Sequence, residues 1–326
     1  MMGSRGAAVL LAALGCCAAQ ADERLTVVLN WVPNAEHAPL FHAHQQGWYA
    51  QTGIAVEIEP VLGSPVAIER AMRGVHTLAV ADFVAWLRAS TAGAQGAAVM
   101  VLEHGSPYAF YFDRRTGLAG PGDFTGRRLA AQPQDPMRAL WPVLAARHLH
   151  DDAPDFAGSD TTAVRWVDMG NAAKPEALAR GDIDVALNPF LHNHLAYAAA
   201  LGKELGAAWW RDLGFEAYGL VLISGAALMR DEPGLLRRFV AVTQRAWAQC
   251  RAAPAPCIDA LIAAQPELDR ADSTALWQLA QPGPAPTGDA FDSARVERTR
   301  TDVEAAFGVR APQAREAATN RFLDRR

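Results

Sequence analysis

The stretch over residues 25–60 constrains the fold more than any other part of the chain. Residues 25–29 are apolar and mostly β-branched, and Pro33, which has no N–H to give to a sheet, ends this predicted strand. Apolar residues then recur at helical intervals until Gly53, which suits the left-handed turn that closes a helix. Residues 54–58 form a second predicted strand. This order predicts a right-handed βαβ crossover within a parallel α/β sheet.

The loop after the first strand carries the first candidate ligand-binding residues. Ligands of open α/β sheets bind at the carboxyl ends of the parallel strands. The loop offers an indole, two amides, a carboxylate and an imidazole, which can stack on a flat ring and hydrogen-bond its edge. The carboxylate belongs to Glu36, and the candidate ligand-binding residues are Asn30, Trp31, Asn34 and His37. Packing in the core is the alternative for Trp31, but its place between polar residues and before a proline favours display in a cleft. His37 either caps the helix or donates to a ligand.

The motif N-W-x-P-N-x-x-H that begins at Asn30 resembles the opening of a family of ABC-importer receptors. G-W-Y from Gly47 and G-I-x-V-x-I from Gly53 extend the similarity. Members of that family bind thiamine pyrimidine precursors, and receptors for sulfonates, taurine and riboflavin are related to them. The resemblance implies an α/β, two-lobed periplasmic-binding-protein fold of type II, with two hinge crossings and extra C-terminal helices. The eukaryotic pyrimidine synthases of thiamine biosynthesis share the same opening, so function needs its own argument.

The first 21 residues have the pattern of a secretory signal peptide. Arg5 precedes a short apolar run that ends in small residues, and we expect cleavage after Ala21 and export to the periplasm. The alternative is a lipid anchor on Cys16 or Cys17. No later segment has an uninterrupted apolar stretch near twenty residues, so the mature protein is expected to be soluble.

Two cysteines, Cys250 and Cys257, follow the predicted signal peptide. A pair this close in sequence can form a disulfide in an oxidising compartment, which is the expectation here. A zinc site would need four ligands with repeated spacing, which the sequence does not contain.

The net charge of −5 and the pI near 6.0 argue against a nucleic-acid partner, since no basic stripe is available to neutralise phosphates.

A mature chain of roughly 300 residues is long for a single core, so two lobes are expected. The first part of lobe 1 is predicted over residues 22–106 and lobe 2 over residues 107–215. Residues 216–326 return to lobe 1 as a strand followed by helices that we expect to pack on that lobe.

Other candidate ligand-binding residues lie where later strands end or where the chain crosses between lobes. They are Asp82, Tyr108, Gln134, Asp135, Asn188, Phe190 and Tyr218. Asp82 has a second interpretation, because a carboxylate at a helix start is also an N-cap.

No catalytic signature is present: there is no G-x-S-x-G elbow, phosphate loop or H-E-x-x-H helix. Most histidines come in pairs two residues apart, and such residues point to different faces of a helix. No metal site is therefore expected, and His192 and His194 are the least unfavourable pair.

The resemblance to the pyrimidine synthases implies a lysine, a histidine and a Cys-rich run. Ala81 and Ala85 occupy the first two positions, and the run is absent. We therefore interpret the chain as a receptor without a cofactor rather than an enzyme.

The combined interpretation is a monomeric receptor that delivers a small solute to an ABC permease. A thiamine-type pyrimidine or a similar flat heteroaromatic is the favoured ligand, because the candidate lining mixes aromatic, acidic and amide groups. A sulfonate, taurine or riboflavin receptor is the alternative, and a pyrimidine-forming enzyme is the third hypothesis. A sulfonate site is expected to present open helix N-termini and few acids.

Overall fold

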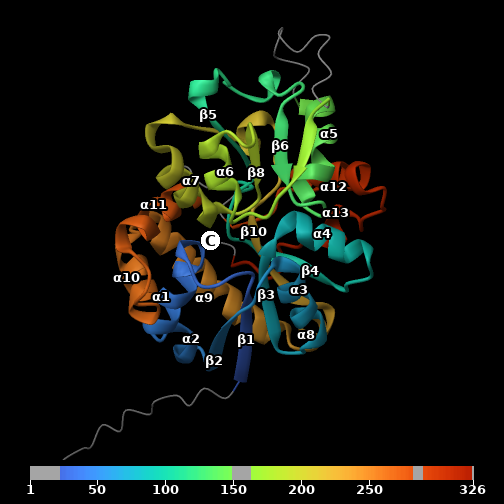
Figure 1. Cartoon of the computed structure of the whole chain (residues 1–326). Helices are drawn as coiled ribbons and strands as arrows, with labels where there is room; N and C mark the ends of the chain where they lie inside the picture. Colours follow the sequence, from blue (N-terminus) through green and yellow to red (C-terminus); the bar gives the residue numbers. More distant parts are fainter. Residues whose placement is uncertain (1–22, 149–162, 282–288, 325–326) are drawn as a thin grey trace, which may run out of the picture.

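The computed structural model describes residues 23–148, 163–281 and 289–324. The expected signal peptide and the two cysteines considered for a lipid anchor, Cys16 and Cys17, lie outside these ranges. Two five-stranded mixed sheets, each with helices around it, form an upper and a lower lobe in Figure 1. This is the two-lobed α/β arrangement expected from the sequence.

The sheet of the first lobe has the strand order β2-β1-β3-β10-β4. Its strands are β1 (Glu23–Leu29), β2 (Ile54–Pro60), β3 (Thr77–Asp82), β4 (Gly96–Val101) and β10 (Leu220–Gly225). β1 pairs in parallel with β2 and β3, and β10 inserts antiparallel between β3 and β4. The last three residues of β1 are fully buried, as expected for a strand covered on both faces.

The sheet of the second lobe has the order β7-β6-β8-β5-β9. Its strands are β5 (Ala109–Asp113), β6 (Arg128–Ala131), β7 (Arg165–Asp168), β8 (Val185–Asn188) and β9 (Leu205–Trp209). β6 pairs in parallel with β7 and β8, whereas β5 runs antiparallel between β8 and β9. The sequence analysis did not predict β9. Its sequence, LGAAW, contains no β-branched residue, so only its pairing with β5 makes it a strand.

The helices differ from the prediction mainly at the start of the chain. The single helix expected before Gly53 is three pieces: η1 (Ala35–His37), α1 (Ala38–Gln45) and α2 (Trp48–Gln51). The break between α1 and α2 falls at Gly47, whose φ of 65° is left-handed. The other helices before β10 are α3 (Ser64–Arg73), α4 (Phe83–Thr91), α5 (Pro136–His148), α6 (Lys174–Arg180) and α7 (His194–Leu201). Those after it are α8 (Ala226–Asp231), α9 (Pro233–Ala252), α10 (Ala255–Ala264), α11 (Arg270–Ala280), α12 (Ser293–Phe307) and α13 (Ala314–Ala317). Among the described residues, none of these helices is long and apolar enough to cross a membrane.

The chain crosses between the sheets twice, after β4 and before β10, and the two crossings are hydrogen-bonded to each other. The N–H of Glu103 donates to the carbonyl of Leu220 at 3.0 Å, and the N–H of Gly219 donates back to the carbonyl of Glu103 at 3.1 Å. Gly219 is required there, because a Cβ would lie 2.6 Å from the carbonyl oxygen of Gly105. The two crossings therefore form one paired hinge.

The C-terminal helices contact more than the first lobe, on which they were all expected to pack. α9 and α10 pack on α1, whereas α12 lies between α4 and α5 and so touches both lobes (Figure 1). From α12, the guanidinium of Arg295 donates to the carbonyls of His104 and Glu216, one on each crossing. The prediction was incomplete because a helical apolar stripe shows that a helix packs without showing on what it packs.

Cys250 and Cys257 form the expected disulfide, which joins the end of α9 to the start of α10. Both residues are buried. Replacing both by alanine is expected to lower the free energy of unfolding by about 2.5 kcal/mol, because the bridge no longer restricts the unfolded chain. Urea unfolding of the variant and of the wild type, with and without a thiol reductant, measures this loss. Two free thiols in exported wild-type protein, seen by non-reducing peptide mapping, would contradict the bridge.

Candidate functional site

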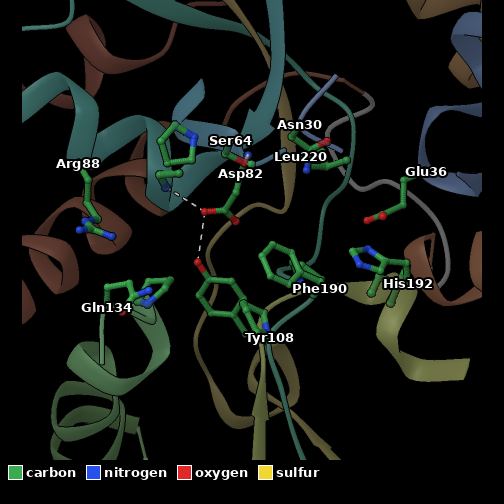
Figure 2. Close-up of a pocket in the computed structure, with 17 residues that line it drawn as sticks. Asn30, Glu36, Ser64, Asp82, Arg88, Tyr108, Gln134, Phe190, His192 and Leu220 are labelled. Atoms are coloured by element: carbon green, nitrogen blue, oxygen red, sulfur yellow. Dashed lines mark hydrogen bonds between the residues drawn. The ribbon is translucent and has the colours of Figure 1, made fainter. Parts of the chain in front are cut away.

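A cavity of about 210 Å³ lies between the lobes, where the ends of parallel strands from both sheets meet. Seventeen residues line it (Figure 2). They are Asn30, Glu36, Gly63, Ser64, Pro65, Asp82, Ala85, Arg88, Pro107, Tyr108, Gln134, Pro136, Pro189, Phe190, Leu191, His192 and Leu220. The strands β1, β3, β6 and β8 each end at one of these residues or shortly before it. The cavity therefore lies at the carboxyl edge of parallel strands, which is where ligands bind in open α/β sheets.

Asp82 both caps a helix and faces the cavity, so the two interpretations of the sequence hold together. Its Oδ1 accepts from the N–H of Ala85 at 2.9 Å and from the hydroxyl of Tyr108 at 3.2 Å, as the dashed lines in Figure 2 show. Its own N–H donates to Ser64 Oγ at 3.0 Å. Oδ2 has no hydrogen-bond partner among the described residues. Burial raises the pKa of Asp82 to about 6, so this carboxyl is ionised at neutral pH with one oxygen unused.

His37 positions the first loop rather than lining the cavity. Its Nδ1 accepts from the N–H of Asn34 at 3.3 Å, which leaves Nε2 as the donor to Asn30 Oδ1 at 3.0 Å. Asn34 Oδ1 accepts from the N–H of Glu36 at 2.9 Å and begins η1. Burial lowers the pKa of His37 to about 3, so the ring is neutral. Of these three predicted residues, only Asn30 reaches the cavity, with its amide Nδ2 as a donor for a ligand.

Trp31 stacks on two rings of the opposite lobe. Its ring centroid lies 5.9 Å from that of Phe190 and 5.3 Å from that of His192, with interplanar angles of 20° and 13°. Phe190 and His192 line the cavity, and Trp31 lies behind them, half-buried. The stacking partners of Trp31 are protein rings, and its contribution to ligand binding stays a prediction. This aromatic stack holds the two lobes together beside the cavity.

The loops of the second lobe contribute Gln134 and Phe190, while two further candidates support them from behind. Asp135 is buried, accepts from the N–H of Met137 at 2.9 Å and lies 3.9 Å from Lys174 Nζ. Asn188 donates to the carbonyl of Phe190 at 2.6 Å. Neither Asp135 nor Asn188 lines the cavity, so their place is in shaping the loops that do.

The two tyrosines near the crossings are placed differently. Tyr108 lines the cavity and donates to Asp82. Tyr218 lies outside the lining: its hydroxyl accepts from the N–H of Asp292 at 2.9 Å, and the guanidinium of Arg295 sits 3.9 Å above its ring. Tyr218 therefore belongs to the hinge contacts of α12.

Several lining residues were not named as ligand-binding candidates from the sequence. Ser64, Arg88 and His192 are among them, and Glu36 was noted only as part of the first loop. Glu36 lies inside the first motif, and Ser64 follows the second strand at a helix start. Both positions come after strand ends, where the sequence analysis expects ligand-binding residues. His192 was weighed only as a metal ligand. Burial lowers its pKa to about 4, and the described residues contain no group of three His, Cys, Asp or Glu side chains able to hold a metal ion.

Comparison with known proteins gives one family match and several distant relatives. The family described as NMT1/THI5 like matches residues 34–256. The riboflavin-binding protein RibY of Chloroflexus aurantiacus is 26% identical over 252 residues, covering 77% of this chain and 69% of the relative. A 4-amino-5-hydroxymethyl-2-methylpyrimidine phosphate synthase of Legionella pneumophila is 23% identical over 248 residues, covering 75% of each chain. The relatives thus include a riboflavin-binding protein and a synthase.

Among solved structures, the periplasmic aliphatic sulphonate binding protein SsuA from Escherichia coli has the same fold. The TM-score is 0.68 at 16% sequence identity, over 88% of this chain and 87% of that one. The architecture is therefore the periplasmic-binding-protein fold.

Removing the ring of Trp31 tests the aromatic stack. Trp31→Ala is expected to weaken ligand binding by roughly tenfold, since the contact that joins the lobes is lost, while the melting temperature falls little. Trp31→Phe should retain most of the affinity. Trp86, which is fully buried, is the matched control, because Trp86→Ala should cost about 3–5 kcal/mol of stability. Titrations and melts of the three variants decide; strong destabilisation by Trp31→Ala with unchanged affinity would place Trp31 in the core.

The raised pKa of Asp82 predicts a pH-dependent stability. Between the ordinary value of 3.8 and about 6, the folded state binds a proton that the unfolded state has lost, so this carboxyl destabilises the fold progressively as pH rises through that window. Asp82→Asn keeps the oxygen that caps α4 and removes the charge. The variant should match wild type near pH 4 and be more stable by about 1–3 kcal/mol at pH 7.5. Urea unfolding at both pH values measures the difference, and equal stability at pH 7.5 would contradict the burial of this charge.

Proposed function

Because the chain belongs to the NMT1/THI5-like family, we propose that it is the solute receptor of an ABC importer for a thiamine-type pyrimidine precursor or a similar small heteroaromatic. The observation that carries this proposal is the cavity between the lobes, with a flat aromatic wall at Phe190 and carboxyl groups at Glu36 and Asp82. Lobes joined by two crossings close on such a ligand by a hinge motion. The ligand would then pass to the permease.

The chemistry of the lining favours a ligand with N–H donors. Asp82 Oδ2 is an acceptor without a partner among the described residues, and an amino group or ring N–H would satisfy it. The start of α4 is already occupied by the carboxylate of Asp82, so an anion placed there would be repelled. The size of the cavity favours one ring, since about 210 Å³ lies below the roughly 300–1,000 Å³ of sites for drug-sized ligands.

One observation favours the second candidate, a receptor for an organic anion such as a sulfonate. The first turn of α3, at Ser64 and Pro65, lines the cavity, and helix N-termini bind anions. Arg88 adds a positive charge on the same side of the cavity in Figure 2. Against this, Ser64 Oγ already accepts from the N–H of Asp82, and two carboxyl groups share the cavity. We rank this candidate below the pyrimidine.

The third hypothesis is a pyrimidine-forming enzyme like the Legionella relative. Ala81 is buried in β3 and Ala85 lines the cavity, at the positions where the resemblance to the eukaryotic synthases implies a lysine and a histidine. Among the described residues, the cavity lining contains neither lysine nor cysteine. The buried Lys174 donates to Asn171 Oδ1 at 2.7 Å and to the carbonyl of Leu187 at 2.6 Å, outside the lining. Without an amine or thiol in the cavity, covalent chemistry has no nucleophile of that kind, which supports the receptor.

We also propose that the receptor works as a monomer in the periplasm after removal of residues 1–21, with an anchor at Cys16 or Cys17 as the alternative. The disulfide supports an oxidising compartment. Mass spectrometry of the mature protein distinguishes the two forms, because cleavage after Ala21 leaves Asp22 as a free N-terminus.

The function is tested by identifying the ligand that co-purifies with the exported protein. Native mass spectrometry should find one small heteroaromatic, and a thermal-shift panel should show stabilisation by 4-amino-5-hydroxymethyl-2-methylpyrimidine above that by taurine or an alkanesulfonate. Tyr108→Phe, which removes a donor to Asp82, should change the affinity less than Phe190→Ala, which removes the aromatic wall. Stabilisation by sulfonates alone would overturn the pyrimidine proposal in favour of the anion receptor.

A further inference from the structure

Two glutamates from separate parts of the chain meet at the wall of the cavity. Glu36, on η1, lines the cavity, and Glu103 lies in the first crossing with 1% of its surface exposed. Their carboxyl groups are within hydrogen-bonding reach of each other. Glu103 Oε2 also accepts from the N–H of Leu220 at 3.4 Å, whereas Oε1 is buried and has no donor among the described residues. Two ionised carboxylates cannot form a hydrogen bond, because neither carries a donor, so this contact needs a proton.

The groups around the pair do not replace that proton. The side chain of Asn34 lowers the pKa of Glu36 and so opposes the effect of burial, without cancelling it. His37 and His192 are neutral, because burial lowers their pKa values to about 3 and about 4. Arg211, after β9, is the cation that acts on Glu103, and no ion pair joins it to either glutamate among the described residues. The charge of the pair is therefore left for a proton or a ligand to neutralise.

The second crossing fixes Glu103 in place. A Cβ on Gly219 would lie 2.8 Å from Glu103 Oε2, so the carboxyl group occupies the space that a side chain at this position would need. Glu103 is also held by the paired backbone bonds of the hinge. Glu36 is the member of the pair that meets the cavity, as Figure 2 shows for its carboxyl group above His192.

We propose that Glu36 and Glu103 form a proton-sharing carboxyl pair that selects ligands with a cationic N–H group, and that such a ligand displaces the proton of Glu36. This deepens the proposed function, on which its ligand half rests. The displaced proton goes to solvent. Glu103 keeps its own proton and donates a hydrogen bond to the Glu36 carboxylate. The N–H of the ligand donates to the acceptor positions of Glu36 that remain free.

Burial raises the pKa of Glu36 to about 7 and that of Glu103 well above its ordinary range. Glu36 therefore loses its proton as the pH rises through about 7, and the charge that it gains favours the protonated form of Glu103. A cationic ligand competes with the proton on Glu36, so its affinity should rise with pH up to about 7 and fall by up to tenfold per pH unit below it. Asp82, with a pKa of about 6, adds to the loss only at lower pH.

The first arm of the test needs no ligand. Infrared spectroscopy of the free protein from pH 5 to 9 should show two protonated-carboxyl bands from the pair. One disappears above about pH 7 and is missing in Glu36→Gln; the other persists at pH 8 and is missing in Glu103→Gln. Glu57→Gln, which removes an exposed carboxyl on β2, is the matched control and should leave both bands. If Glu103→Gln removes no band at pH 8, the pair does not share a proton and the proposal fails.

The second arm uses three probes with the same ring: benzamidinium, benzamide and benzoate. Calorimetry at pH 8 should give benzamidinium at least tenfold tighter binding than benzoate. This preference should fall several-fold in Glu36→Gln, where the ionised Asp82 retains the remainder. Glu103→Gln should preserve the preference, because an amide imitates the protonated carboxyl as a donor. Equal binding of benzamidinium and benzoate by wild type would overturn the selection. If none of the probes binds although both bands appear, the flat-ring receptor is contradicted while the proton-sharing pair is upheld.

Discussion

The pairing of the two crossings is the interaction on which the rest of the molecule depends. Backbone bonds between Glu103, Gly219 and Leu220 bring β10 back into the first sheet beside β3. This pairing fixes how the carboxyl ends of the strands in one sheet face those in the other. It also places Tyr108, just after the first crossing, within reach of Asp82. The cavity is thus a consequence of the hinge, because its walls come from loops that neither sheet could align alone.

Burial decides the charge of the site. His192, which lines the cavity, and His37, which lies behind the first loop, are both neutral because their surroundings exclude water. The carboxyl groups respond in the opposite way and hold their protons to higher pH. The lining holds two carboxyl groups and one cation, Arg88, so it presents acceptors, and its charge is negative where both acids are ionised. This is the physical basis for preferring a ligand rich in N–H groups to a sulfonate.

The fold could be predicted from the sequence because its signals are local. The strand over residues 25–29, the stop at Pro33 and the return at Gly53 depend on neighbouring residues alone, and strand ends of a parallel sheet converge wherever the sheet forms. That rule was enough to nominate Asn30, Asp82 and Gln134, all of which line the cavity. The break at Gly47 was missed because the helical pattern of apolar residues continues through it. The strand β9 was missed because only its pairing with β5 makes it a strand.

The parts of the site that could not be predicted depend on contacts between distant segments. Nothing near Glu36 in sequence indicates that Glu103 will lie against it, because the two meet only through the paired crossings. In the same way, Trp31 was expected to await a ligand, yet Phe190 and His192 from the other lobe cover it.

The aromatic stack has a consequence for how a ligand enters. The cavity lies between the lobes, so a separation of the lobes that admits a ligand would break the contacts of Trp31 with Phe190 and His192. Arg295, which donates to carbonyls on both crossings, ties the two crossings to each other at the hinge. The free energy of ligand binding therefore includes the energy of closing the stack as well as the contacts with the ligand. Trp31 lines no part of the cavity, so it contributes to affinity through the energy of closing the stack and not through contacts with the ligand.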